Sequence, residues 1–261
     1  MLSIGIDSGS STTKGVLFDG QEILEKRLIP TGANPKRTIH SLYNEFKQIA
    51  DSKETQVYTV TTGYGRDLLE ESDKKITEIT CHGIGASYLS PKINAVIDIG
   101  GQDSKVILLD KDSNIKDFLM NDKCAAGTGR FVEVIMRLLH QDLFDIDIYI
   151  ADNEPVKISS MCTVFAESEV IGLLAQDISG NAIASGVIDS ICNRTATFAK
   201  RLPLDGQVFF SGGLAQFNVI QQNLQNHLGH DVVYHELSQY AGAIGAAVIG
   251  HRKGINKIKL T

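Results

Sequence analysis

The sequence predicts an α/β protein made of two similar halves, and three observations lead to this fold class. Residues 6–19 align without gaps on residues 97–110, at an offset of 91 residues and with six identities in 14 positions. Each copy has the pattern of a strand, a tight polar turn and a second strand. Helical and strand patterns alternate along the rest of the chain, which is typical of helices covering a sheet. We therefore expect two α/β domains facing each other across a cleft, with a boundary near residues 90–94.

In the first half, strands are predicted from short apolar runs, and one helix from apolar residues at helical spacing between Ile39 and Ala50. The expected strands are Leu2–Ile6, Lys14–Phe18, Leu24–Ile29 and Val57–Thr61. The triplet of strands in this half is the first copy of the repeated unit. We assign residues 1–93 to the first domain.

The second half, residues 94–261, repeats the strand triplet and then adds several helices. Its expected strands are Ala95–Ile99, Lys105–Leu109, Ile115–Leu119 and Val208–Phe210. Its expected helices lie near Ala125–Leu139, Cys162–Ala175, Ala182–Lys200, Phe217–His227 and Ala241–Gly250. The C-terminal helix is free to pack back on the first domain.

The composition is that of a folded protein with no general attraction to polyanions. Of 261 residues, 43% are hydrophobic and 21% charged, and 25 basic against 31 acidic residues give a net charge of −6. This composition excludes a disordered chain, and the charge argues against binding to nucleic acid or anionic lipid. The sequence has neither a basic leader nor an apolar stretch long enough to span a membrane, so we expect a cytoplasmic protein.

An aspartate ends the first strand of each copy, and a turn rich in glycine or hydroxyl groups follows it. Backbone N–H groups and hydroxyls in such turns bind phosphate oxygens, and Lys14 adds a positive charge. Asp7 and Asp98 are candidate Mg2+ ligands, since Mg2+ prefers one or two carboxylates with phosphate and water. A third turn, Ser-Gly-Gly at 211–213, lets a purine or ribose approach the backbone. The candidate ATP-binding residues are Asp7, Ser8, Gly9, Ser10, Ser11, Thr12, Thr13, Lys14, Asp98, Gly100, Gly101, Gln102, Ser211, Gly212 and Gly213.

Each turn by itself is also compatible with a simple hairpin, but their order along the chain is informative. It resembles the first phosphate, second phosphate and adenosine motifs of the superfamily of actin, sugar kinases and heat-shock chaperone ATPases. The chain has no Walker sequence and no Rossmann fingerprint after its first strand. The resemblance implies a duplicated actin-like, ribonuclease H-like ATPase fold. Gln102 and Asp103, with Asp7, are then candidate catalytic residues that orient the attacking water or the Mg2+ shell, although turn polarity explains Gln102 and Asp103 equally well.

Four cysteines are present, and a reducing cytosol makes structural disulfides unfavourable for them. Cys124 and Cys162 each precede a predicted helix, and a helix N-terminus favours the thiolate that binds metal. Their separation by 37 residues, without a CxxC or a histidine pair, does not fit a zinc site. Two thiolates per chain complete a four-cysteine 4Fe–4S site only in a two-fold symmetric dimer. The alternative is that both are ordinary buried thiols, as we expect for Cys81 and Cys192.

Six segments resemble those of the ATP-dependent activator, or reductase, component of 2-hydroxyacyl-CoA dehydratases, a family related to the ATPase subunits of benzoyl-CoA reductase. They are TTGYGR (61–66), ITEITCHGIGAS (76–87), VIDIGGQDSKV (96–106), MNDKCAAGTGRF (120–131), SSMCTVFAESEV (159–170) and AGAIGAA (241–247). The resemblance implies that Cys124 and Cys162 bind one 4Fe–4S cluster shared by a homodimer. It also implies that ATP hydrolysis, with Mg2+, drives a low-potential electron into a partner iron-sulfur dehydratase, after reduction by a donor such as ferredoxin or flavodoxin.

Three alternatives remain at this point. The partner can be a related double-cubane-cluster protein instead of a dehydratase. The protein can be a small-molecule kinase of the same superfamily, with Asp103 as the base. It can also be a nucleotide sensor whose cysteines respond to redox conditions. A kinase would be colourless, and its ATPase activity would respond to a small hydroxylated substrate.

Overall fold

The computed structural model describes residues 1–123, 127–150, 154–159 and 163–258. It divides into two compact units. The first unit contains Met1–Ile93, Leu109–Lys116 and His235–Thr261, and the second contains Asn94–Leu108 and Asp117–Tyr234. The assignment of two domains with a boundary after residue 93 stays a prediction. Within the described residues, no helix is both long and apolar enough to cross a membrane.

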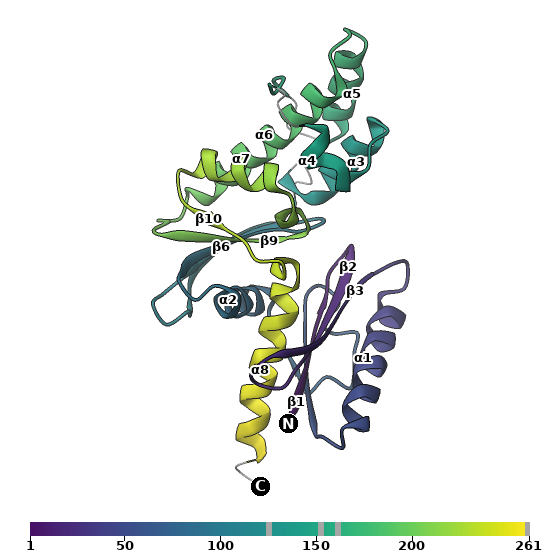
Figure 1. Ribbon diagram of the computed structural model, residues 1–261, viewed down its shortest axis with the longest axis vertical. Helices are drawn as coiled ribbons and strands as arrows, with labels where there is room; N and C mark the ends of the chain where they lie inside the picture. The colour runs from purple at the N-terminus through teal and green to yellow at the C-terminus, as the bar shows by residue number, and fades with distance from the viewer. Residues whose placement is uncertain (124–126, 151–153, 160–162, 259–261) are drawn as a thin grey trace. The chain divides into compact units, whose positions relative to one another are not determined.

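The first unit is built on a five-stranded sheet with strand order β3-β2-β1-β4-β5 (Figure 1). Its strands are β1 (Leu2–Ser8), β2 (Thr12–Phe18), β3 (Ile23–Pro30), β4 (Val57–Thr62) and β5 (Lys74–Lys75). Strand β2 is antiparallel to both of its neighbours, β1 and β3, whereas β4 runs parallel to β1 and β5 parallel to β4. Every residue of β1 is buried, as expected for a central strand covered on both faces.

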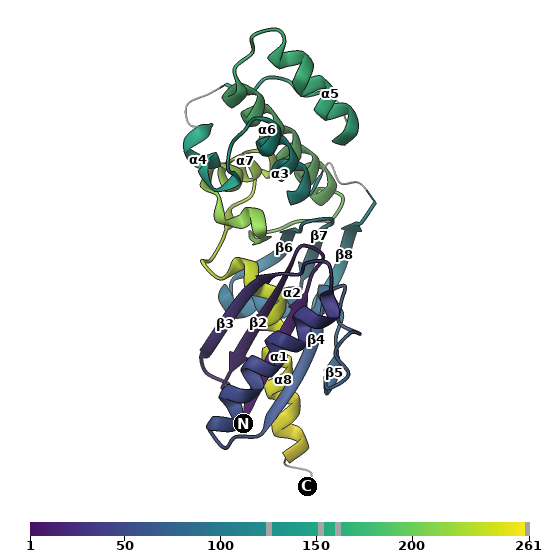
Figure 2. The same ribbon diagram turned by 90° about the vertical axis from the view of Figure 1, so that its right-hand side faces the viewer.

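Helices cover both faces of this sheet. Helix α1 (Pro35–Ser52) places Ile39, Leu42 and Phe46 against Ile4 and Ile6 of β1, and Figure 2 shows it lying over the strands. Its first turn is closed by the Asn34 side chain, which accepts from the Arg37 N–H at 3.0 Å. Helices α2 (Glu78–Leu89) and α8 (Ala241–Ile258) cover the opposite face, where Val60 contacts Cys81 and Ala246.

Glycines let α2 and α8 pack closely against each other. A Cβ atom at Gly85 of α2 would lie 1.8 Å from the Ala241 carbonyl oxygen, and one at Gly245 of α8 would lie 1.8 Å from the Cys81 carbonyl oxygen. Neither position can carry a side chain unless the two helices separate. A short 3-10 turn, η4 (Ser238–Tyr240), leads into α8.

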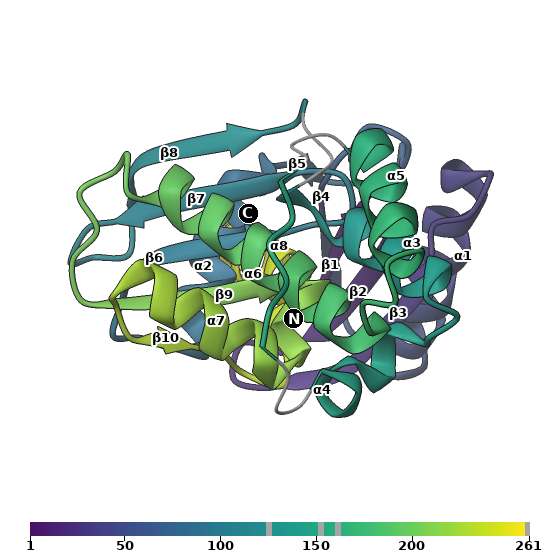
Figure 3. The same cartoon turned by 90° about the horizontal axis from the view of Figure 1, so that it is seen from above.

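The second unit repeats this sheet and adds more helices. Its strand order is β10-β9-β6-β7-β8, with β6 (Ile93–Ile99), β7 (Ser104–Leu109), β8 (Ile115–Asn121), β9 (Gln207–Gly212) and β10 (Val232–Val233). The helices are α3 (Gly129–Leu138), α4 (Ile146–Tyr149), α5 (Thr163–Leu174), α6 (Gly180–Ala199) and α7 (Asn218–Leu228), with 3-10 turns η2 (Leu143–Asp145) and η3 (Gly213–Gln216). Figure 3 shows α6 and α7 over the strands, where Ile188 and Ile220 join Ile97 and Phe210 in one core.

The two sheets confirm the predicted duplication. In the first, Asp7 of β1 is paired with Lys14 of β2, and in the second Asp98 of β6 is paired with Lys105 of β7. These pairs differ by the 91-residue offset of the sequence repeat. The α/β class and the duplicated unit are therefore as predicted.

Some elements differ from the prediction in ways that have physical causes. Helix α3 begins at Gly129 and not near Ala125, because Thr128 is extended at φ −130° and ψ 163° and occupies the N-cap position. The short strands β5 and β10 were not predicted, since two residues carry no periodic pattern. Helix α2 was not assigned bounds; it starts at Glu78 because the Thr77 hydroxyl caps the Thr80 N–H.

Candidate nucleotide site

The turn between β1 and β2 is closed by its own backbone. The Gly9 N–H donates to the Thr12 carbonyl at 3.1 Å, and a Cβ atom at Gly9 would lie 2.9 Å from that oxygen. Thr31 supports the turn from β3's end, since its hydroxyl donates to the Gly9 carbonyl at 2.7 Å and lies 2.9 Å from the Thr13 hydroxyl. Thr13 therefore holds the turn, while Ser10 and Ser11 are on its exposed side.

Asp7 lies at the base of this turn and is almost completely buried. Its Oδ2 atom is 3.9 Å from the Lys14 Nζ and 3.9 Å from the His82 Nε2. Its Oδ1 atom has no hydrogen-bond partner among the described residues. A buried carboxylate oxygen without a hydrogen-bond partner lowers the stability of the fold unless a ligand binds it. Such an oxygen is a suitable ligand for a hard cation such as Mg2+. The predicted role of Asp7 at a Mg2+ site therefore fits its surroundings.

The corresponding aspartate of the second unit has a direct ionic partner. Lys105 is 1% exposed, and its Nζ lies 3.2 Å from Asp98 Oδ2 and 2.8 Å from Asp103 Oδ2. The Gly100 N–H also donates to the Asp103 carbonyl at 2.9 Å, which closes the turn. Lys105 thus holds together two of the predicted site residues, Asp98 and Asp103. Gln102, another predicted residue of this turn, is exposed. Lys105 was not predicted to have a role, although its identity with Lys14 in the repeat was a signal.

The third predicted motif joins the same turn within the second unit. Ser211 is buried at the end of β9, and Gly212 has φ +93° with its Cβ position 2.1 Å from the Ile99 carbonyl oxygen. Only glycine allows β9 to run so close to the end of β6 at this φ. Gly213 then begins η3.

Helix α3 starts directly on the turn after β6. The Gly129 N–H donates to the Gly100 carbonyl at 2.8 Å, and the Arg130 N–H donates to the Gly101 carbonyl at 3.1 Å. Thr128 makes no side-chain cap hydrogen bond, so these carbonyls take the place of a side-chain cap. The candidate phosphate turn and the helix that follows the Cys124 segment are therefore joined by backbone hydrogen bonds.

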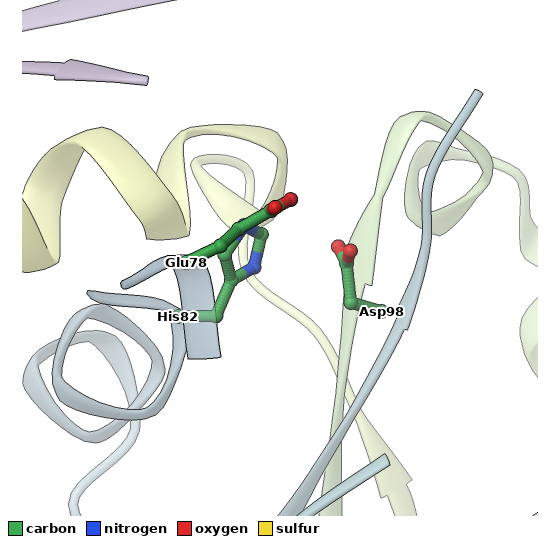
Figure 4. A group of neighbouring side chains, drawn as sticks. All are labelled: Glu78, His82 and Asp98. Atoms are coloured by element: carbon green, nitrogen blue, oxygen red, sulfur yellow. The ribbon is translucent and has the colours of Figure 1, made fainter. Parts of the chain in front are cut away.

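Two further side chains were missed as functional candidates. Figure 4 shows the side chains of Glu78 and His82, both on α2. Glu78 and His82 are four residues apart and so lie on one side of the helix. A Glu78 carboxylate oxygen and a His82 ring nitrogen lie within 4.8 Å of each other. The sequence pattern did not single out His82, because its contact with Asp7 depends on tertiary packing.

The predicted cluster ligands Cys124 and Cys162 lie outside the described residues. The other two cysteines are buried packing residues. Burial raises the pKa of the Cys81 thiol to about 12 and also raises that of Cys192, whose Sγ lies 3.6 Å from the Ile220 carbonyl oxygen. Neither is suited to act as a thiolate at neutral pH.

Two sheets of the same strand order, each with a buried aspartate at the end of its first strand, define the fold of an actin-like ATPase. Comparison with known proteins gives the family. The chain belongs to the BadF/BadG/BcrA/BcrD ATPase family, which matches residues 4–250.

Similar proteins cover the chain from end to end. It is 48% identical to the uncharacterized protein YjiL of Escherichia coli over 96% of this chain and 97% of that protein. It is 40% identical to the activator of lactoyl-CoA dehydratase of Anaerotignum propionicum, over 98% of this chain and 100% of the relative. A solved structure of the 2-hydroxyisocaproyl-CoA dehydratase activator from Clostridium difficile, with bound ADPNP, has a TM-score of 0.91 and 35% identity, covering 100% and 98% of the two chains. The resemblance stated from the sequence is confirmed.

Proposed function

We propose that this ATPase is an electron donor that activates a 2-hydroxyacyl-CoA dehydratase. The family membership and the similarity to activators of such dehydratases support this proposal. ATP and water become ADP and phosphate. This hydrolysis drives one electron from the ATPase to an iron-sulfur partner protein in each cycle. In this proposal Cys124 and Cys162 of two chains in a homodimer hold a 4Fe–4S cluster, which supplies the low-potential electron.

Residues of the two turns bind and orient the nucleotide. Asp7 offers Oδ1 to Mg2+, and the backbone and hydroxyls of residues 8–13 bind phosphate with Lys14. Asp98, held by Lys105, contributes to the Mg2+ shell, and Gln102 and Asp103 orient the attacking water. Segment 211–213 binds the adenosine.

The observation that carries the coupling is the attachment of α3 to the turn after β6. The carbonyls of Gly100 and Gly101 accept from the first amides of α3, and Cys124 precedes this helix by five residues. A movement of the turn on hydrolysis therefore shifts the start of α3 and the segment before it. In this proposal the backbone hydrogen bonds between the candidate phosphate turn and the start of α3 provide the coupling.

Iron and sulfide analysis after anaerobic purification tests the proposal. We expect about four of each per dimer, and their loss in Cys124→Ala and Cys162→Ala. Cys192→Ala is the matched control, because Cys192 is a buried packing thiol, and it should keep the iron. Iron-free protein with intact ATP turnover would reject electron donation. Stimulation of that turnover by a small hydroxylated compound would support a kinase instead.

A further inference from the structure

The buried histidine beside Asp7 has a clear geometric relation to it. His82 comes from α2 and Asp7 from the end of β1, and each side chain is no more than 5% exposed. The His82 Nε2 lies 3.9 Å from Asp7 Oδ2, and Lys14 approaches the same oxygen at the same distance. Two nitrogen-bearing side chains therefore face one oxygen of the carboxylate.

The other oxygen has different surroundings. Asp7 Oδ1 is buried and lacks a hydrogen-bond partner among the residues that the structure describes. Gly63 lies beside this oxygen: a Cβ atom at Gly63 would lie 2.5 Å from Oδ1, and the φ of Gly63 is +83°. Any side chain at Gly63 would fill the space that Oδ1 faces.

A second glycine keeps the carboxylate and the histidine together. A Cβ atom at Gly242, in the first turn of α8, would lie 2.7 Å from Asp7 Oδ2 and 2.9 Å from His82 Nε2. The backbone of α8 thus closes this side of the pair, and the carboxylate cannot rotate toward it. Lys14, His82 and the backbone of α8 therefore lie on the Oδ2 side of the Asp7 carboxylate, and Gly63 lies on its Oδ1 side.

We propose that His82 is a positioning residue for metal binding: with Lys14 it holds Oδ2 of Asp7, so that Oδ1 is presented to the Mg2+ of Mg2+·ATP. This inference rests on the Mg2+ role of Asp7 in the proposed function. Groups that orient a metal ligand commonly change metal affinity by about 10–100-fold when they are removed. If His82 only fills space, a side chain of similar length will replace it without effect on metal affinity.

The experiment compares His82→Gln with His82→Met in the full chain. The two side chains are similar in length, and neither is branched at Cβ or Cγ, but only glutamine keeps an N–H donor toward Asp7. Mn2+ serves as the probe, and its affinity in the presence of ADPNP is measured by the electron paramagnetic resonance signal of free Mn2+. ADPNP affinity without metal is measured in parallel. His40→Met is the matched control, because His40 lies 3.7 Å from the Glu71 carboxylate in the same unit but does not contact Asp7.

We expect His82→Met to weaken Mn2+ binding about 10-fold or more, with metal-free ADPNP affinity unchanged. His82→Gln should recover most of the affinity, and His40→Met should match the wild type. Equal Mn2+ affinity in His82→Met and wild type would overturn the proposal, as would equal losses in the Gln and Met variants. His82→Ala replaces the Met variant if the latter does not fold. Since the readout needs no cluster or partner protein, a negative result here is separate from failure of the electron-donor proposal, which iron analysis decides.

Discussion

Lys105 allows a quantitative test of how the second unit is held together. The lysine is buried between Asp98 and Asp103, and Asp98 is 3% exposed. Lys105→Met keeps the length of the side chain but removes its charge, which leaves the Asp98 carboxylate buried without its cation. Removing one partner of a buried ion pair costs about 3–5 kcal/mol, because the remaining charge is not solvated. We expect the free energy of unfolding to fall by that amount in urea denaturation followed by circular dichroism.

Two further variants make this measurement decisive. Lys36→Met removes an exposed pair, since Lys36 is 56% exposed and lies 3.2 Å from Glu70, and should cost about 0–1 kcal/mol. Adding Asp98→Asn to Lys105→Met should recover part of the loss, because the buried carboxylate that faced Lys105 becomes neutral. If Lys105→Met costs no more than Lys36→Met, the pair is solvated and the reasoning is refuted.

Two other predictions concern the buried cysteines and the glycine contacts. Burial raises the pKa of Cys81 to about 12 and also raises that of Cys192, so both thiols remain protonated at pH 8. Iodoacetamide should therefore label neither cysteine in the native protein and both after unfolding. Mass spectrometry maps the labelled residues. Native labelling of either would contradict this. Gly245→Ala should lower stability by about 1–3 kcal/mol, since its Cβ would lie 1.8 Å from the Cys81 carbonyl oxygen. Gly172→Ala in α5 should raise stability by about 0.5–1 kcal/mol, because, outside the local helix backbone, no atom of a described residue lies within 4 Å of the Cβ position at Gly172. If Gly245→Ala and Gly172→Ala have equal effects on thermal unfolding, the contact between α2 and α8 is not the cause of the loss.

Local patterns were sufficient to predict the repeated strands. A strand, a turn and a second strand are contiguous in sequence. The repeat at an offset of 91 residues therefore indicated both hairpins and which residues correspond between them. The pairing of Asp7 with Lys14 in the first hairpin corresponds to that of Asp98 with Lys105 in the second. The candidate residues on these hairpins could therefore be named before the fold was known.

The contacts that refine the site could not be predicted in the same way. His82 meets Asp7 only because α2 packs on α8 through Gly85 and Gly245, a contact between segments far apart in the chain. Lys105 binds Asp103 as well as Asp98, which depends on the conformation of the turn between them. The start of α3 depends on carbonyls of another turn, and no nearby residue pattern records such partners.

The attachment of α3 to Gly100 and Gly101 also limits how this chain can change in length. Between Gly101 and Gly129 the chain leaves the turn as β7, continues through β8 and returns to the same turn. Insertions in the loop between β7 and β8 leave both anchored ends in place, whereas one removed residue at the start of α3 would leave a backbone amide without its acceptor. The β7–β8 loop at residues 110–114 is therefore a place to insert a tag or reporter, and the junction at Gly129 is not.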